Sequence, residues 1–355
     1  MKTYILAFAA AMLLAGCQKA EIDPQNNGIG SPGYNAATLL DNAANNVIVG
    51  TYRDLDAQAA ALQTAVAALA AAPTAATLAT ARQAYRDARA PWEATEAFAF
   101  GPVSTQGLDG IIDTWPLNRV DLVALLASAD PLSPASLRTR DGGLQGFHPI
   151  EFLLFGPDSN KGLANFTARE YIFLNSSAQN LRAATAQLLS AWLPAGGNFA
   201  AAFGKAGPGS PVYPKQKQAV QELLDGMIGP ADEVPNSKIE QPLVQQNTDF
   251  EEAKFSRNSK AEFLQNLAGI EAIYTGRYAA TSGTGFSNLV VKYNPALDTR
   301  FRQELAAAQQ AIASLPGRFD EAILQNPAAV RAAQAKVRTV LNTLQTDMQP
   351  LVNAL

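Results

Sequence analysis

Apolar residues recur at three- and four-residue steps through most of the chain, a period that places them on one face of an α-helix. The same segments are rich in alanine, leucine, glutamine and arginine, which are strong helix formers. This pattern predicts helices over residues 39–72, 77–100, 118–127, 169–192, 215–228, 260–274, 299–315 and 327–348. We find no convincing series of alternating strands bounded by hairpin turns. The sequence therefore predicts an all-α protein.

Glycine and proline interrupt the helical pattern between residues 196 and 214, where they cluster too densely for a helix to continue. Such a cluster is typical of a boundary between domains. We therefore expect two helical-bundle domains, residues 34–195 and residues 215–355, joined by a Gly/Pro-rich linker over 196–214. Each side contains enough predicted helices for a bundle of about four.

The N-terminus has the features of a targeting segment. Lys2 precedes an apolar run, Ile5 to Leu14, that is too short to span a bilayer as a stable helix. The run ends in Leu14-Ala15-Gly16-Cys17, which resembles the lipobox of bacterial lipoproteins. That resemblance implies that residues 1–16 are a signal peptide and that Cys17 becomes lipidated. The alternative is an ordinary secretory signal followed by an incidental cysteine.

Lipidation would leave no free thiol, because Cys17 is the only cysteine in the sequence. Disulfides and thiolate metal sites would then both be excluded. Residues 17–33 contain prolines, glycines and asparagines and are expected to form a flexible tether. We expect a lipid-anchored protein of the bacterial cell envelope, with the membrane as one partner. Gln18, in place of the aspartate that marks inner-membrane retention in enteric bacteria, favours the outer membrane.

Charge bears on the possible partners of the chain. The formal net charge is −4, the isoelectric point is about 5.2, and no long basic run is present. Nucleic-acid binding, which depends on basic surfaces, is therefore disfavoured.

The most informative local pattern surrounds His148, the only histidine in the chain. His148 and Glu151 are three residues apart and can share one face of a helix, and a neutral imidazole beside a carboxylate suits a divalent metal. A structural interpretation is also open. Pro149 would push His148 out of the helical region and occupy the first position of a helix, whose dipole Glu151 would then oppose.

Further carboxylates precede this motif. Glu93 and Glu96 share a helical face by their three-residue spacing, and Asp109 and Asp113 follow a little later. Their oxygen atoms could complete a metal site begun by His148. The alternative is that these residues form an exposed acidic face at the end of a helix.

Taken together, several ordered segments resemble the imelysin family, also called imelysin-like or insulin-cleaving metalloproteinase-like proteins. Residues 146–151 match the family motif G-x-H-x-x-E, and residues 152–156 match the apolar stretch that follows it. The resemblance runs from about residue 34 to the C-terminus. Its remaining blocks are residues 93–102, residues 112–116, residues 255–259 with Glu262, Phe263 and Asn266, and residues 274–276.

The resemblance implies two helical bundles, an envelope location and association with iron uptake. It also implies that His148 and Glu151 belong to a metal site near the domain interface. By the same resemblance, Ser256, Asn258 and Glu262 are expected near one cleft, for which Trp115 is a further candidate. Helix capping is the alternative role for Ser256 or Asn258.

The sequence leaves three functions open. A metal site must use His148 and carboxylates, because the chain has one histidine and would have no free cysteine after processing. The absence of H-E-x-x-H, E-x-x-H and G-x-S-x-G motifs argues against a common zinc protease, a paired di-iron site and a serine hydrolase, respectively. We favour a metal-binding protein that holds a divalent or trivalent ion, with iron or zinc expected, and that works with iron-uptake proteins of the envelope. The alternatives are a metallopeptidase in which Glu151 is a ligand or general base, and a protein- or peptide-binding module in which His148 and Glu151 are structural.

Overall fold

The computed structural model describes residues 34–355, so the predicted signal peptide, Cys17 and the tether lie outside the described residues. Within this range the fold is all-α, as the sequence predicts, apart from one hairpin of two-residue strands. No helix among residues 34–355 combines the length and the hydropathy needed to cross a membrane.

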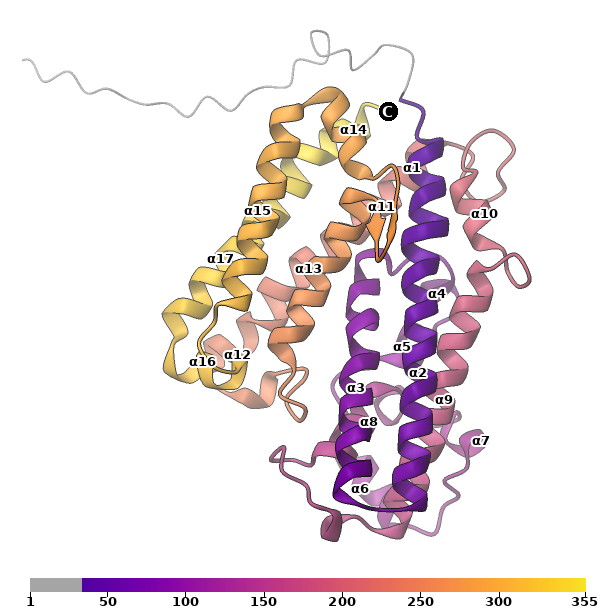
Figure 1. Cartoon of the computed structure of the whole chain (residues 1–355), viewed down its shortest axis with the longest axis vertical. Helices are drawn as coiled ribbons and strands as arrows, with labels where there is room; N and C mark the ends of the chain where they lie inside the picture. The colour runs from indigo at the N-terminus through magenta and orange to yellow at the C-terminus, as the bar shows by residue number, and fades with distance from the viewer. Residues whose placement is uncertain (1–33) are drawn as a thin grey trace, which may run out of the picture.

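The N-terminal helices form one packed group (Figure 1). Residues 37–71 are one uninterrupted helix, with α1 and α2 joined by a π-helical turn over residues 43–48. This helix packs against α3 and α9, and α8 packs against both α3 and α9. The elements are α1 (Ala37–Asn42), α2 (Val49–Ala71), α3 (Ala75–Thr95), α4 (Pro102–Thr105), α5 (Asp109–Ile112), α6 (Arg119–Ala127), α7 (Pro134–Leu137), α8 (Phe147–Phe155) and α9 (Ala168–Trp192).

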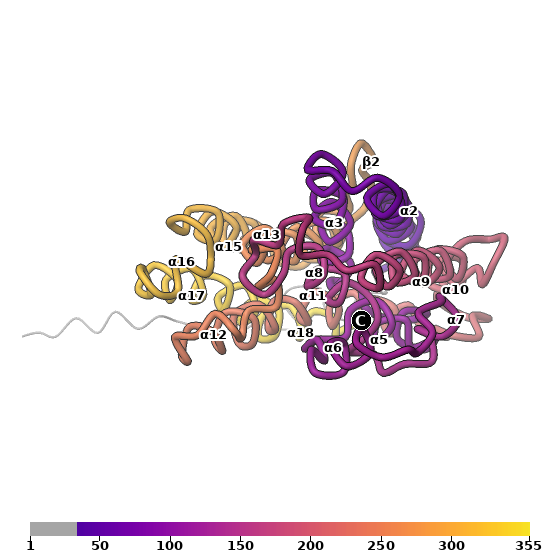
Figure 2. Tube along the Cα trace, turned by 90° about the horizontal axis from the view of Figure 1, so that it is seen from below, coloured from indigo at the N-terminus to yellow at the C-terminus, as the bar shows by residue number. Residues whose placement is uncertain are grey.

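The C-terminal helices form a second group beside the first, as the view along the helices shows (Figure 2). In this group α13 packs against α11 and α15, and α17 packs against α15 and α11. The elements are α11 (Gln216–Glu233), α12 (Glu240–Gln245), α13 (Ser259–Thr275), β1 (Arg277–Tyr278), β2 (Thr281–Ser282), α14 (Phe286–Tyr293), α15 (Pro295–Ala313), α16 (Phe319–Gln325), α17 (Pro327–Thr343) and α18 (Gln349–Asn353).

Single turns complete the secondary structure. They are the 3₁₀ turns η2 (Glu96–Phe98), η3 (Gly142–Leu144), η4 (Leu163–Asn165) and η6 (Thr248–Phe250), and the π-helical turns η1 (Ala43–Ile48), η5 (Val234–Lys238) and η7 (Leu344–Met348).

The segment expected to be a linker contains a short helix of its own, α10 (Phe199–Gly204), which packs against α1. Aromatic side chains hold it there. The ring of Phe199 lies 4.9 Å from that of Trp192, and the ring of Phe203 lies 5.4 Å from that of Tyr213. Aromatic pairs of this kind, in which Trp192, Phe203 and Tyr213 are buried and Phe199 is partly buried, outweigh the poor helix propensity of the surrounding glycines. The division into domains at residues 196–214 stays a prediction.

The two groups of helices meet where α3 packs against α13 and where α11 packs against η2. Gly269 of α13 makes the first contact possible, because a Cβ atom at this position would lie 2.1 Å from the carbonyl oxygen of Ala94. Real Cβ atoms do not come so close to a backbone oxygen, so only glycine permits this approach. The contact brings the polar face of α3 that contains Glu93 against Glu262 on α13.

We predict that Gly269→Ala destabilises the protein. Alanine is the better helix former, but the added methyl group must push α3 and α13 apart, and overpacking of this kind costs about 1–3 kcal/mol. Chemical denaturation followed by circular dichroism measures the change. Gly162→Ala is the matched control, because nothing lies within 4 Å of its added Cβ, and we expect a change below about 0.5 kcal/mol. Equal stability of the two variants would contradict the role assigned to Gly269.

Candidate metal centre

Helix α8 contains His148. It begins at Phe147, so His148 is its second residue and Pro149 its third. The sequence left two interpretations open, and the one that places His148 outside the helix with Pro149 at its first position is wrong. The difference has a simple cause. The N–H groups of the first helical turn have no acceptor within the helix, so a proline is tolerated at its third position as well as at its first.

Gly146, directly before α8, positions this helix against α5. Its φ of +74° lies in the left-handed region, and an added Cβ would fall 2.0 Å from the carbonyl oxygen of Ile112. Both constraints require glycine. The backbone at the end of α5 therefore lies against the start of α8. Asp113, the next residue after Ile112, is thereby brought beside His148.

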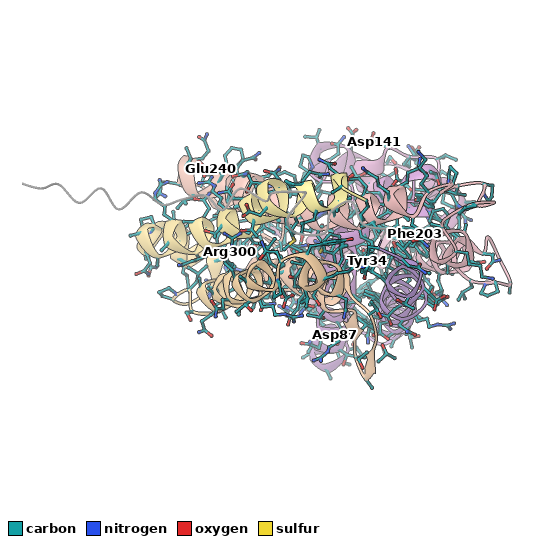
Figure 3. The ribbon with its side chains drawn as sticks, turned by 90° about the horizontal axis from the view of Figure 1, so that it is seen from above. Tyr34, Asp87, Asp141, Phe203, Glu240 and Arg300 are labelled. Atoms are coloured by element: carbon teal, nitrogen blue, oxygen red, sulfur yellow. The ribbon has the colours of Figure 1, made fainter. Side chains whose placement is uncertain are left out.

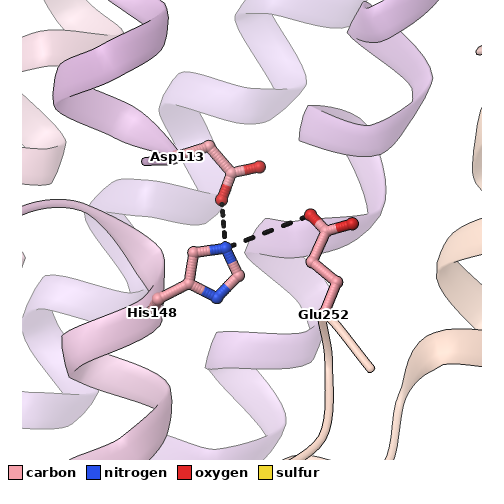
Figure 4. A group of neighbouring side chains, drawn as sticks. All are labelled: Asp113, His148 and Glu252. Atoms are coloured by element: carbon pink, nitrogen blue, oxygen red, sulfur yellow. Dashed lines mark ion pairs between the residues drawn. The ribbon is translucent and has the colours of Figure 1, made fainter. Parts of the chain in front are cut away.

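Three candidate ligand atoms converge at His148 (Figure 4). The Nε2 atom of His148 lies 3.1 Å from Asp113 Oδ1 and 4.0 Å from Glu252 Oε1. The side chain is 2% exposed, and the short contact with Asp113 lacks hydrogen-bond geometry, which leaves Nε2 without a hydrogen-bond partner among the described residues. One imidazole nitrogen and two carboxylate oxygens within 4.8 Å of one another are a donor set that can hold a metal ion.

Glu151 lies on the other side of the imidazole ring. Its Oε2 atom is 3.7 Å from His148 Nδ1, and its Oε1 atom accepts hydrogen bonds from the backbone N–H and the hydroxyl of Ser256, at 2.7 and 2.6 Å. The Glu151 side chain is fully buried. The structure thus places the two residues of the motif together, but it places Glu151 against Nδ1 and the other carboxylates against Nε2.

A buried arginine connects the carboxylates of the cluster. Arg89 Nη1 lies 2.5 Å from Asp113 Oδ1, and Arg89 Nη2 lies 3.2 Å from Glu252 and 2.9 Å from Glu262. The same guanidinium also pairs with Glu93, one helical turn further along α3. Arg89 therefore joins α3, the residue after α5, the segment before α13, and α13 itself.

A lysine has the same role nearer to the solvent. The Nζ atom of Lys238 lies 3.0 Å from Glu93, 3.0 Å from Glu96 and 2.9 Å from Glu252. The side-chain amide of Asn266 donates further hydrogen bonds to Glu93 Oε2 at 2.9 Å and to Glu96 Oε2 at 2.7 Å. Lys238 and Asn266 together fix the carboxylates of Glu93 and Glu96 in place.

Carboxylates outnumber the permanent cations in this cluster. Arg89 and Lys238 are the cations, and the carboxylates are Glu93, Glu96, Asp113, Glu151, Glu252 and Glu262. Two of these carboxylates also bind protons more tightly than usual. Burial raises the pKa of Glu96 well above its usual range, and burial raises the pKa of Glu262 to about 7 despite Arg89. Without a further cation, the cluster holds protons instead.

His148 takes up part of this negative charge. Burial alone would lower its pKa, but the neighbouring Asp113 and Glu151 carboxylates outweigh burial and raise the pKa to about 10. Burial in turn would raise the pKa of Asp113, but Arg89 and His148 hold it well below its usual range. In the metal-free protein at neutral pH, His148 is therefore an imidazolium ion beside an ionised Asp113.

A cleft of about 590 Å³ leads from the solvent to this cluster, and Asp113, Glu252 and Lys238 are among the residues that line it. Trp115, predicted to lie near the cleft, lines it and is 37% exposed. The other cleft candidates do not line it: Ser256 and Glu262 are buried, and Asn258 is partly buried. Ser256 holds Glu151, and Asn258 donates a hydrogen bond of 3.0 Å to Glu262.

Sequence reasoning missed three members of the cluster, namely Arg89, Lys238 and Glu252. Arg89 had a signal, because it lies four residues before Glu93 and so shares its helical face. Glu252 had only its place in the acidic run 249–252, a short distance before residues 255–259. Lys238 had no signal that distinguishes it from an exposed lysine.

This geometry defines a class of all-helical proteins. They have a buried histidine–carboxylate centre at the contact of two helical groups. The comparisons with known proteins agree. The family model described as imelysin, of peptidase family M75, matches residues 48–348. The chain belongs to the imelysin family, and the resemblance seen in the sequence is confirmed.

Individual relatives support the same assignment. The chain is 32% identical to iron-regulated protein A of Synechococcus elongatus over 312 residues, which cover 86% of this chain and 84% of that protein. Two crystal structures share the fold. One, named as an iron-regulated protein A precursor of Parabacteroides distasonis, is 22% identical with a TM-score of 0.78, covering 88% of this chain and 96% of its own. The other, an imelysin-like protein of Psychrobacter arcticum, is 16% identical with a TM-score of 0.73, covering 90% and 97%.

We predict that the metal-free protein loses stability as the pH rises. The pKa of His148 is about 10 in the folded protein and near 6.5 when unfolded. The stabilisation from its bound proton is therefore complete below about pH 6.5 and disappears towards pH 10, a loss on the order of 5 kcal/mol. Urea denaturation across this range, with a chelator present, measures it. His148→Gln should flatten this part of the profile, and an identical profile in the variant would contradict the assignment.

Proposed function

We propose that this protein binds a metal ion between His148, Asp113 and Glu252 and serves iron acquisition in the bacterial cell envelope. The observation that carries the proposal is His148 Nε2. This buried nitrogen has no hydrogen-bond partner among residues 34–355, although two carboxylate oxygens lie within 4.0 Å of it. A polar atom is rarely left this way without a reason, and an ion between the three groups would provide one.

The donor set fits iron or zinc. Imidazole suits both metals, and the two carboxylates add the oxygen donors and the negative charge that divalent and trivalent ions require. Glu151 would act on the far side of the ring, since a carboxylate against Nδ1 orients a ligating histidine and raises its basicity. Arg89 and Lys238 would hold the acidic ligands in place, because their ion pairs fix both Asp113 and Glu252.

The link to iron is supported by the relatives named iron-regulated protein A. The envelope location is supported by the signal-peptide pattern and by the lipobox-like segment that ends at Cys17. A lipid at Cys17 would attach the protein to a membrane, with the outer membrane favoured, and would place it beside iron-uptake proteins of the envelope as partners.

The geometry gives less support to a metallopeptidase. Such a mechanism needs a general base that reaches both the metal-bound water and the substrate. Glu151, the residue predicted for this role, is fully buried and accepts two hydrogen bonds from Ser256, and it does not line the cleft. The interaction module, with a purely structural His148, gives no reason for the excess of carboxylates over cations around this residue.

We predict one tight site in the metal-free protein, residues 18–355, when iron(II), iron(III) or zinc is titrated in by calorimetry. His148→Gln and Asp113→Asn should each abolish it, because each removes a ligand. Glu151→Gln should weaken it by about 10- to 100-fold, as loss of a carboxylate partner does. Asp225→Asn, a matched change of an exposed residue on α11, should bind like the wild type. Full binding by His148→Gln, with helical content retained, would refute the proposed site.

We also predict that the affinity rises with pH. His148 has a pKa of about 10 in the metal-free protein, so its proton must leave when the imidazole becomes a ligand. Below that pKa, loss of one proton corresponds to an increase of about tenfold in affinity per pH unit. Zinc titrations between about pH 5.5 and 7.5 test this expectation. An affinity that does not change over this interval would show that His148 does not bind the metal.

A further inference from the structure

The carboxylates of the cleft extend from the solvent to His148 with increasing burial. Asp109 and Glu233 line the outer part and are exposed, and Asp113 and Glu252 are partly buried. His148, which touches the last two, is 2% exposed. The acidic residues of one cleft thus range from exposed carboxylates to the two that touch the buried histidine.

The charge of this path is almost entirely of one sign. Five of the residues that line the cleft are acidic: Glu96, Asp109, Asp113, Glu233 and Glu252. Lys238 is the only cation among the described residues that line it, and its ammonium group is already paired with Glu93, Glu96 and Glu252. An anionic ligand would therefore meet several carboxylates and no available positive group.

The proton affinities of the outer carboxylates are consistent with a negative potential in the cleft. Burial first, and then the charge of Asp113, raises the pKa of Asp109. The pKa of Glu233 is raised by burial and by the charges of Glu252, Glu93 and Asp113, although Lys238 opposes this. Clefts lined by charges of one sign focus the electric field and increase the association rate of oppositely charged ligands by about 10- to 1,000-fold.

We propose that the cleft selects the chemical form of the metal: Asp109 and Glu233 guide the hydrated cation to His148, whereas anionic metal chelates are excluded. This inference rests on the proposed metal-binding function and adds the ligand class that enters the site. Asp109 and Glu233 are steering residues and not ligands, since they belong to neither group of converging donor atoms at the site.

The test is the rate of metal association. Stopped-flow tryptophan fluorescence can report it with Fe²⁺ under anaerobic conditions, because Trp92 Nε1 donates a hydrogen bond of 2.5 Å to Asp113 Oδ2. Asp109→Asn combined with Glu233→Gln should slow association by about three- to tenfold at low salt and leave the dissociation rate unchanged. The difference should disappear at about 500 mM sodium chloride, where the Debye length is only a few ångströms.

A matched control removes the same two charges elsewhere. Asp87→Asn combined with Glu271→Gln changes a separate cavity between α2, α3 and α13 and should leave the association rate as in the wild type. The two cavities are on different sides of the molecule. Helix α5, which contains Asp109, lies on the other side from α2, which lines the control cavity (Figure 2). Figure 3 shows Asp87 at the edge of the molecule opposite Asp141.

Ferric citrate made with radiolabelled citrate tests the exclusion of anions. We expect that, after gel filtration, the protein carries iron but no radiolabelled citrate, because the iron enters only after it has left the chelate. Retention of citrate with the iron, or association that is insensitive to salt and to the Asp109/Glu233 substitutions, would overturn the proposed selection while leaving the metal site intact. Failure of the wild type to bind any ion would instead overturn the proposed function, and this inference with it.

Discussion

The architecture of the site depends on one buried charge, the guanidinium group of Arg89. Its side chain is completely enclosed, and burial of an unpaired charge would cost several kcal/mol. Carboxylates from four different segments must therefore stay around it: Glu93, Asp113, Glu252 and Glu262. Two of these, Asp113 and Glu252, also face His148. The requirement to neutralise Arg89 thus brings the two groups of helices together and places the candidate ligands.

Such a network stabilises a fold inefficiently, because the desolvation of buried charges is unfavourable and well-packed apolar side chains of similar volume often stabilise a protein as well or better. The ratio of carboxylates to cations in the network says more about its function than its contribution to stability does. The carboxylates outnumber Arg89 and Lys238. Burial raises the pKa values of Glu96 and Glu262, and the neighbouring Asp113 and Glu151 carboxylates raise that of His148. A bound metal cation would replace these protons. The surplus of negative charge, and not the histidine alone, is what distinguishes a metal site from a structural salt-bridge cluster.

The sequence predicted the helices well because their apolar period is a local property. It also brought His148, Glu151 and Asp113 forward as candidates, from motif spacing and family resemblance. It left the start of α8 open between two interpretations, because the first helical turn accepts proline at more than one position. Lys238 and Glu252 were missed because their roles arise only when η5 and the segment before α13 meet α3 in space. Glycine at positions 146 and 269 permits the contacts that assemble the site, yet a glycine within a sequence does not reveal which backbone approaches it.

The most direct test of the central claim is crystallographic. Crystals of the protein loaded with iron, measured on both sides of the iron absorption edge, would locate the ion by its anomalous scattering. The account predicts a single strong peak between His148 Nε2, Asp113 and Glu252, at the ligand distances of a metal bound by nitrogen and oxygen. A peak elsewhere, or an Nε2 atom that remains without a metal in a fully loaded protein, would contradict it.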